Sequence, residues 1–180
     1  MDRQISFLGT SLKRKKTSQK KVSAKNDKIT MYTDGASRGN PGASGARVFA
    51  TRGDEVVLKN GYYLGKKTNN QAEYLALLIG LCLLKGKVGS GDFKTVSIAI
   101  CADSELMVRQ MKGVYKVKNP VIMKIKGAID SILEGVTCTF RHVLREKNKD
   151  ADELANIGVD KKRKIPQYVT DFFLKHDIEM

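Results

Sequence analysis

Ile29-Thr-Met-Tyr-Thr-Asp-Gly35 joins a strand-like alternation of apolar and polar residues to an Asp-Gly pair. The alternation predicts a β-strand that stops at Asp34, because Asp-Gly favours a turn. The residues from Gly35 to Gly45 are rich in Gly, Ser and Pro and predict a loop. A carboxylate at the end of an apolar segment suggests that a cation lies beside it.

The segments that follow predict two more strands and then helices alternating with strands. Residues 45–51 and 56–64 have the pattern of the two arms of a hairpin. An almost wholly apolar segment predicts a covered helix that is capped by Asn69 or Asn70 and runs to about Lys85. The remaining predicted elements are a buried strand, two helices, a strand and a helix, at residues 96–102, 104–111, 120–133, 136–144 and 151–158.

This order of elements predicts an α/β fold with a mixed five-stranded sheet, three antiparallel strands followed by two parallel ones, flanked by helices. Four acids occupy related places in it. Asp34 and Asp103 each end a predicted strand, and Glu73 and Asp152 each lie in the first turns of a predicted helix. Sites in such sheets form where strands end beside helix starts, so the four side chains are expected to converge.

The 180 residues carry a formal net charge of +14, and the excess is concentrated at the N-terminus. Residues 1–28 hold nine Lys and Arg against two Asp. We expect residues 1–27 to be a disordered basic arm, either a solubilising or targeting tail or a tether for a polyanion. Residues 28–160 form the predicted domain, and residues 161–180 a basic, amphipathic extension packed on it.

Cys82, Cys101 and Cys138 lie in apolar segments and predict buried, reduced thiols of an intracellular protein. The longest apolar stretch, residues 74–84, is about half a membrane span, and the N-terminus lacks the apolar core of a signal peptide. We therefore expect a monomer in the cytoplasm, or in the nucleus of a eukaryote, with no membrane contact.

Four neighbouring carboxylates repel one another strongly unless some are protonated or cations bind between them. Oxygen ligands without His or Cys select Mg²⁺ or Mn²⁺ over zinc. Two such ions are known to catalyse displacement at phosphorus. One ion activates a water molecule, and the other stabilises the leaving oxygen. The basic domain and the acidic site both favour a phosphodiester substrate.

Four segments, in this order, closely resemble the motifs of type 1 ribonuclease H. They are Tyr32-Thr-Asp-Gly-Ala-Ser-Arg-Gly-Asn-Pro-Gly42, Thr68-Asn-Asn-Gln-Ala-Glu-Tyr74, Ala102-Asp-Ser104 and His142-Val-Leu-Arg-Glu-Lys-Asn-Lys-Asp-Ala-Asp-Glu-Leu-Ala-Asn156. The resemblance makes residues 28–160 a ribonuclease H-like catalytic domain. The short link between residues 113 and 120 is similar to that of the compact branch of the family, which lacks a basic helical handle.

The resemblance implies hydrolysis of the RNA strand of an RNA–DNA hybrid, leaving 5′-phosphate and 3′-hydroxyl ends. It implies two Mg²⁺ ions, with Mn²⁺ as a substitute. Asp34 would bridge both ions, Glu73 and Asp103 would hold the ion on the leaving-group side, and Asp152 would hold the ion that carries the attacking water.

The family's substrate contacts also have counterparts in this chain. Asn69 and Asn70 resemble the amides that contact 2′-hydroxyls, the groups that distinguish RNA from DNA. Ser37, Arg38 and Gly39 resemble the family's backbone contacts. Thr68 resembles a residue of the pocket for a DNA-strand phosphate. His142 lies in the predicted strand and is either structural or an aid to product release.

Several alternatives stay open at this point. Asp150 competes with Asp152 as the fourth acid, because it is better placed to cap the last predicted helix. Another nuclease of the same fold is a second enzyme hypothesis, against which the Asn69-Asn70 pair argues. A binding module that has lost cleavage is the third, against which the presence of all four acids argues. Cleavage of double-stranded RNA is also open.

Overall fold

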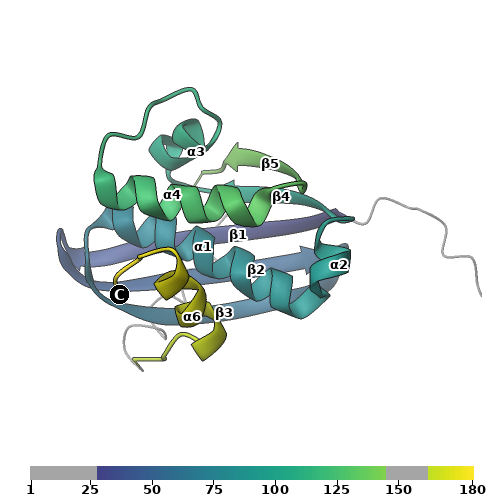
Figure 1. The fold of residues 1–180 in the computed structure, drawn as a ribbon, viewed down its shortest axis with the longest axis horizontal. Helices are drawn as coiled ribbons and strands as arrows, with labels where there is room; N and C mark the ends of the chain where they lie inside the picture. Colours follow the sequence, from purple (N-terminus) through teal and green to yellow (C-terminus); the bar gives the residue numbers. More distant parts are fainter. Residues whose placement is uncertain (1–27, 145–161) are drawn as a thin grey trace, which may run out of the picture.

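The computed structural model describes residues 28–144 and 162–180 and shows one five-stranded sheet in the order β3-β2-β1-β4-β5 (Figure 1). β1, β2 and β3 pair antiparallel, and β4 pairs parallel with both β1 and β5. The predicted mixed sheet is confirmed. Its strands are β1 (Lys28–Gly39), β2 (Gly42–Arg52), β3 (Glu55–Lys67), β4 (Ser97–Ala102) and β5 (Thr137–His142).

In Figure 1, α1, α4 and α6 lie over one face of the sheet. Residues 74–84 of α1 are all buried, as expected of a helix enclosed by the sheet and by other helices. Asn119 accepts hydrogen bonds from the first turn of α4 and Pro120 is its first residue, as predicted. The helices are α1 (Asn69–Val88), α2 (Ser90–Phe93), α3 (Glu105–Met111), α4 (Pro120–Leu133) and α6 (Gln167–Lys175).

The prediction of a loop from Gly35 to Gly45 is wrong. β1 and β2 remain paired from Ile29 and Arg52 to Gly39 and Gly42, so only two residues form the turn. The small residues of this segment are typical of turns, but the ladder of backbone hydrogen bonds continues through them, since pairing requires no large side chain. Asp34 therefore lies inside β1 and not at its end.

Side chains alternate along these strands, which separates the helix-covered face of the sheet from the other face. A Cβ atom on Gly80 of α1 would lie 3.1 Å from Met31 Sδ and 3.1 Å from Val48 Cγ1, so Met31 and Val48 face this helix. Asp34 is three residues after Met31 and Arg47 is next to Val48. Both therefore project from the opposite face.

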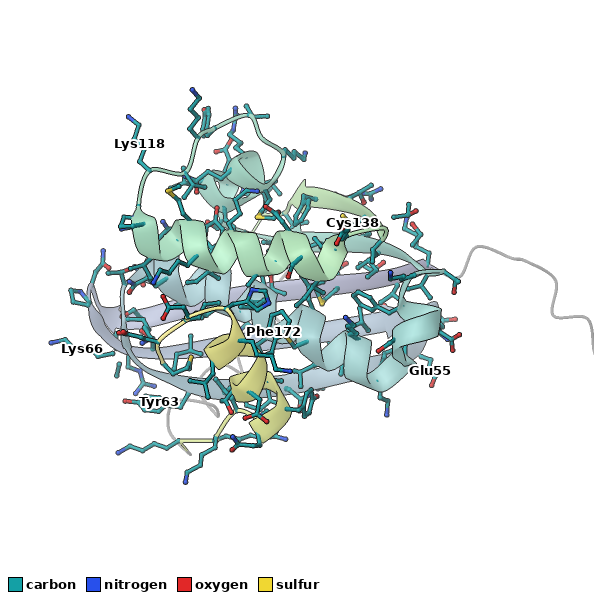
Figure 2. The ribbon with its side chains drawn as sticks, viewed as in Figure 1. Glu55, Tyr63, Lys66, Lys118, Cys138 and Phe172 are labelled. Carbon is teal, nitrogen blue, oxygen red and sulfur yellow. The ribbon has the colours of Figure 1, made fainter. Side chains whose placement is uncertain are left out.

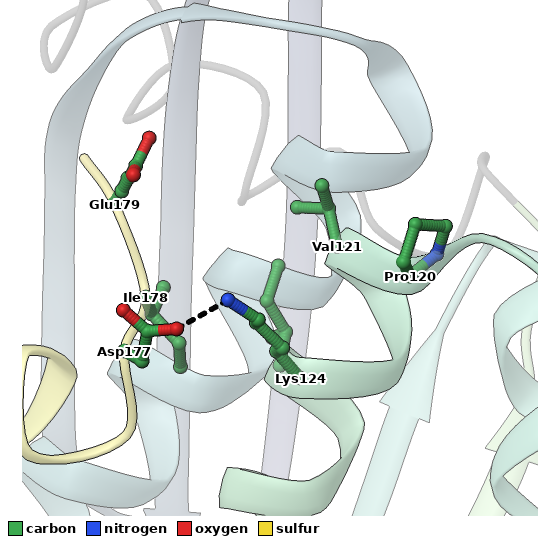
Figure 3. Close-up of a pocket in the computed structure, with 7 residues that line it drawn as sticks. Pro120, Val121, Lys124, Asp177, Ile178 and Glu179 are labelled. Atoms are coloured by element: carbon green, nitrogen blue, oxygen red, sulfur yellow. Dashed lines mark hydrogen bonds and ion pairs between the residues drawn. The ribbon is translucent and has the colours of Figure 1, made fainter.

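The C-terminal residues pack on the same core as the sheet and α1. Val169 and Phe173 of α6 and the later Ile178 are buried within that core. The last residues and the start of α4 border a hollow of about 320 Å³, where Lys124 is paired with Asp177 (Figure 3). Other side chains extend outward, among them Lys66 on β3 and Lys118 before α4 (Figure 2).

Two of the three cysteines are buried as predicted, Cys82 and Cys101, while Cys138 is half-buried. Burial raises the pKa of the Cys82 thiol to about 12, so this thiol is held protonated. Among the described helices, none has the length and apolar character needed to cross a membrane. The predicted arm at residues 1–27, the predicted helix at residues 151–158 and both Asp150 and Asp152 lie outside the described residues.

Candidate active site

Three of the four predicted acids come together. One carboxylate oxygen from each of Asp34, Glu73 and Asp103 lies within 4.8 Å of the others. The parallel pairing of β1 with β4 explains two of them, because Thr33 is in register with Ala102 and the next residues are the two aspartates. Glu73 comes from the second turn of α1. The convergence of these three residues is thus a consequence of strand register and helix placement.

Gly35 allows α1 to approach β1 at this cluster. A Cβ atom on Gly35 would lie 2.0 Å from the backbone carbon of Ala72 and 2.3 Å from the backbone nitrogen of Glu73, so only glycine fits. Its backbone N–H donates to Glu73 Oε2 at 3.4 Å. The backbone contact therefore brings Glu73 beside Asp34.

Asn69 connects the start of α1 to the far end of β1. Its Oδ1 accepts a hydrogen bond of 2.9 Å from the backbone N–H of Ser37, and its own backbone N–H donates to Asn40 Oδ1 at 3.1 Å. The Ser37 hydroxyl donates to the backbone oxygen of Lys67 at 2.9 Å. Two segments predicted to contact substrate, residues 37–39 and 68–70, are thus adjacent in the fold.

The donor set fits a hard divalent cation. Asp34 is buried, while Glu73 and Asp103 are half-buried, so the cluster combines one desolvated carboxylate with two that are less deeply buried. Carboxylates this close repel one another, and a cation between them removes the repulsion. Oxygen ligands of this kind are those that Mg²⁺ and Mn²⁺ prefer.

Comparison with known proteins identifies the family. A family model described as "Reverse transcriptase-like" matches residues 32–158. Ribonuclease HI of Halobacterium salinarum is 34% identical over 135 residues, 74% of this chain and 65% of that protein. Ribonuclease H of Pseudomonas entomophila is 34% identical over 148 residues, 76% of this chain and 97% of that protein. The chain belongs to the type 1 ribonuclease H family.

A solved ribonuclease H1 structure matches most of this chain. LC11-RNase H1, isolated from compost, has been crystallised in complex with an RNA/DNA hybrid. That structure matches with a TM-score of 0.67 and 40% identity, over 74% of this chain and 97% of that one. In this ribonuclease H-family chain α3 ends at Met111 and α4 begins at Pro120, so no helical handle separates them.

The predicted cap of α1 by Asn69 or Asn70 is wrong, because Thr68 caps the helix. Thr68 Oγ1 accepts from the backbone N–H of Gln71 at 3.2 Å, and Gln71 Oε1 accepts from the backbone N–H of Thr68 at 2.9 Å. This reciprocal pair is a capping box, and its Thr-x-x-Gln spacing was present in the sequence. With Thr68 as the cap, the Asn69 side chain can bond to β1.

Arg47 of β2 is a site residue that sequence reasoning missed. Its Nη2 lies 2.9 Å from Asp34 Oδ2, and the two side chains are only 1% and 8% exposed. Arg47 and Asp34 are directly opposite each other on the antiparallel strands. A single arginine among the apolar residues of a predicted strand was the available signal, since buried charges require partners.

His142 lies at the end of β5, exposed and beside the third acid of the ribonuclease H motif. Its Nε2 is 3.2 Å from the backbone oxygen of Asp103, and Ala102 of β4 is in register with His142. The residue therefore belongs to the strand, as predicted, and also borders the acidic cluster. Among the other predicted contacts, Arg38 and Gly39 are exposed at the β1–β2 turn and Asn70 is half-buried.

Proposed function

We propose that this ribonuclease H-family chain is an endonuclease that hydrolyses the RNA strand of RNA–DNA hybrids, leaving 5′-phosphate and 3′-hydroxyl ends. The observation that carries the proposal is the cluster of Asp34, Glu73 and Asp103, whose oxygens lie within 4.8 Å of one another beside the Asn69 segment. The complex of LC11-RNase H1 with an RNA/DNA hybrid supports the choice of substrate.

Two divalent cations, Mg²⁺ with Mn²⁺ as a substitute, are the proposed cofactors. Asp34 would be shared by both ions, Glu73 and Asp103 would hold the ion on the leaving-group side, and Asp152 would hold the other. When bound, such ions activate a water molecule and stabilise the leaving oxygen. The protein's own contribution is to hold these carboxylates in place, through strand register for Asp34 and Asp103 and through the Gly35 contact for Glu73.

Recognition of RNA is assigned to the start of α1 and the end of β1. Asn69 and Asn70 are proposed to contact 2′-hydroxyls, with the backbone of Ser37, Arg38 and Gly39 beside them. Asn69 is exposed, and its bond to Ser37 leaves the amide with additional hydrogen-bonding capacity. Thr68 is proposed to contact a DNA-strand phosphate. His142 is proposed to assist product release, because it borders the cluster and is exposed.

The proposed partner is a hybrid duplex bound by a monomer in a reducing compartment, the cytoplasm or the nucleus. The net charge of +14 favours a polyanion. The arm at residues 1–27 is a proposed tether that adds affinity through counterion release.

Cleavage of four labelled substrates tests the proposal. RNA–DNA hybrid, double-stranded RNA, double-stranded DNA and single-stranded RNA are incubated with Mg²⁺ or Mn²⁺ and with the wild type, Asp103→Asn or Asp54→Asn. Asp54 is exposed in the β2–β3 turn and serves as the control. We expect the wild type and Asp54→Asn to cut the hybrid, and Asp103→Asn to lose at least about a hundredfold in rate.

Each alternative function has its own result in this assay. Cleavage of double-stranded DNA in preference to the hybrid would indicate another nuclease of the same fold. A hybrid that stays intact with the wild type, but that the wild type retards in a native gel, would indicate a binding module. An Asp103→Asn variant that cuts as fast as the wild type would contradict the role given to the acidic cluster.

A further inference from the structure

Arg47 is a cationic side chain inside the acidic site, and the proposed catalytic scheme does not use it. Its guanidinium is 1% exposed and pairs with Asp34 Oδ2 at 2.9 Å. Both side chains project from the face of the sheet opposite α1, as the alternation along β1 and β2 requires. The pair is therefore built into the strand register and does not depend on a flexible surface contact.

The guanidinium restrains the Asp34 carboxylate through its contact with Oδ2. Arginine remains charged at any pH at which the protein folds, and its planar group holds a carboxylate more rigidly than an ammonium group does. Asp34 is the acid proposed to be shared by both cations, so a rotation of this carboxylate would disturb the ligands of both. A buried partner that prevents rotation acts on the site without touching substrate.

The same charge opposes the cations. Three carboxylates in the cluster attract divalent ions, and a guanidinium beside one of them lowers that attraction. In the absence of cations, the guanidinium also offsets part of the repulsion among the carboxylates. Arg47 therefore has two opposite effects. Its contact with Asp34 favours turnover, and its positive charge weakens the binding of cations.

We propose that Arg47 is a positioning residue that orients Asp34 for cleavage at the expense of affinity for divalent cations. The expected effect of Arg47 on turnover rests on the proposed function. The expected effect of Arg47 on cation affinity can be measured without any cleavage. Substitution of a residue with only a structural role would change stability. It would not raise the affinity for Mg²⁺ and lower kcat at the same time.

Arg47→Met and Arg47→Lys test the proposal, with Lys59→Met as the control. Lys59 is exposed on β3, so its substitution removes one positive charge from the surface. For each variant we would measure the Mg²⁺ dissociation constant by calorimetry, the urea midpoint with EDTA and with saturating Mg²⁺, and kcat and KM on the hybrid at saturating Mg²⁺.

For Arg47→Met we expect the Mg²⁺ dissociation constant to fall at least roughly tenfold, since one opposing charge is lost. We also expect a urea midpoint that depends more on Mg²⁺ than in the wild type, and a kcat at least about tenfold lower with KM nearly unchanged. Arg47→Lys retains the charge and is expected to keep the wild-type Mg²⁺ affinity, with a kcat between those of the wild type and Arg47→Met. Lys59→Met should match the wild type.

Wild-type Mg²⁺ affinity together with wild-type kcat in Arg47→Met would overturn the proposal. So would weaker Mg²⁺ binding, because it would show that the guanidinium supports the cation site and does not oppose it. If Arg47→Met fails to fold, a kcat for Arg47→Lys equal to that of the wild type overturns the positioning role. If the wild type does not cut the hybrid, the proposed function fails, and the calorimetric result still decides whether Arg47 opposes cation binding.

Discussion

Gly35 is the residue on which the geometry of the acidic cluster depends most directly. The backbone of β1 touches the backbone of α1 there, at Ala72 and Glu73, without an intervening side chain. Such a contact places a carboxylate by backbone geometry, which varies less than a side-chain rotamer. Glu73 is thereby held beside Asp34 before any cation binds.

Gly35→Ala is expected to displace the start of α1 and to separate Glu73 from Asp34. The added Cβ would lie 2.0 Å from the Ala72 backbone, so we expect a loss of about 1–3 kcal/mol in the free energy of unfolding. We expect hybrid cleavage to fall at least about tenfold. Urea denaturation and steady-state rates measure the two effects.

Gly127→Ala is the matched control, because a Cβ on Gly127 within α4 meets no atom within 4 Å. This substitution is expected to raise stability by about 0.4–1 kcal/mol and to leave cleavage unchanged. Equal rates for Gly35→Ala and the wild type would show that the close approach of β1 and α1 is unnecessary for the site.

The beginning of α1 serves both the helix and the site. Thr68 and Gln71 satisfy backbone donors at its first turn, and Asn69 beside them bonds to Ser37 of β1. Because the cap is made by Thr68, the asparagine side chain is available for other contacts. The proposed RNA contacts therefore lie on a helix end whose position is held by two sets of hydrogen bonds.

Thr68→Ala is expected to lower the free energy of unfolding by about 1 kcal/mol through loss of the cap. Gln71→Ala removes only the reciprocal hydrogen bond and should cost less. If Thr68 also contacts a DNA-strand phosphate, KM for the hybrid rises in Thr68→Ala and not in Gln71→Ala. The same KM in both variants would limit Thr68 to its role as a cap.

At the level of the whole molecule, the C-terminal residues complete the core on the helix-covered side of the sheet. α6 lies against this side in Figure 1, and its Val169 and Phe173 are buried. The backbone N–H of Tyr63 on the edge strand β3 donates to the carbonyl oxygen of Arg163 at 2.9 Å. We propose that residues 162–180 belong to the folding unit of the domain.

Phe173→Ala is expected to lower the free energy of unfolding by about 3–5 kcal/mol, because it leaves a cavity in the core. Leu174→Ala is the control, since the neighbouring side chain is 75% exposed and contributes little. Thermal and urea unfolding followed by circular dichroism compare the two. Similar small losses in both variants would show that α6 is peripheral to folding.

Much of this fold could be predicted from local sequence patterns. The order of the five strands, the helices α1, α3 and α4, the Asn119-Pro120 helix start and the acids Asp34, Glu73 and Asp103 all follow from periodicity, capping residues and motifs within short segments. These features are accessible because each depends on neighbours in the chain. The Thr68 cap was equally local and was missed only because two asparagines follow it. The short α2 and the helix α6 were not predicted.

Only the tertiary structure determined which residues far apart in the sequence come into contact. It extended β1 and β2 through the glycine-rich segment, brought Gly35 against Ala72, and paired Asp34 with Arg47. Each outcome depends on the register between strands or on the seating of a helix on a sheet. A change of one residue in register would turn Arg47 to the other face of the sheet, so the pairing follows from the assembled sheet and not from any single segment.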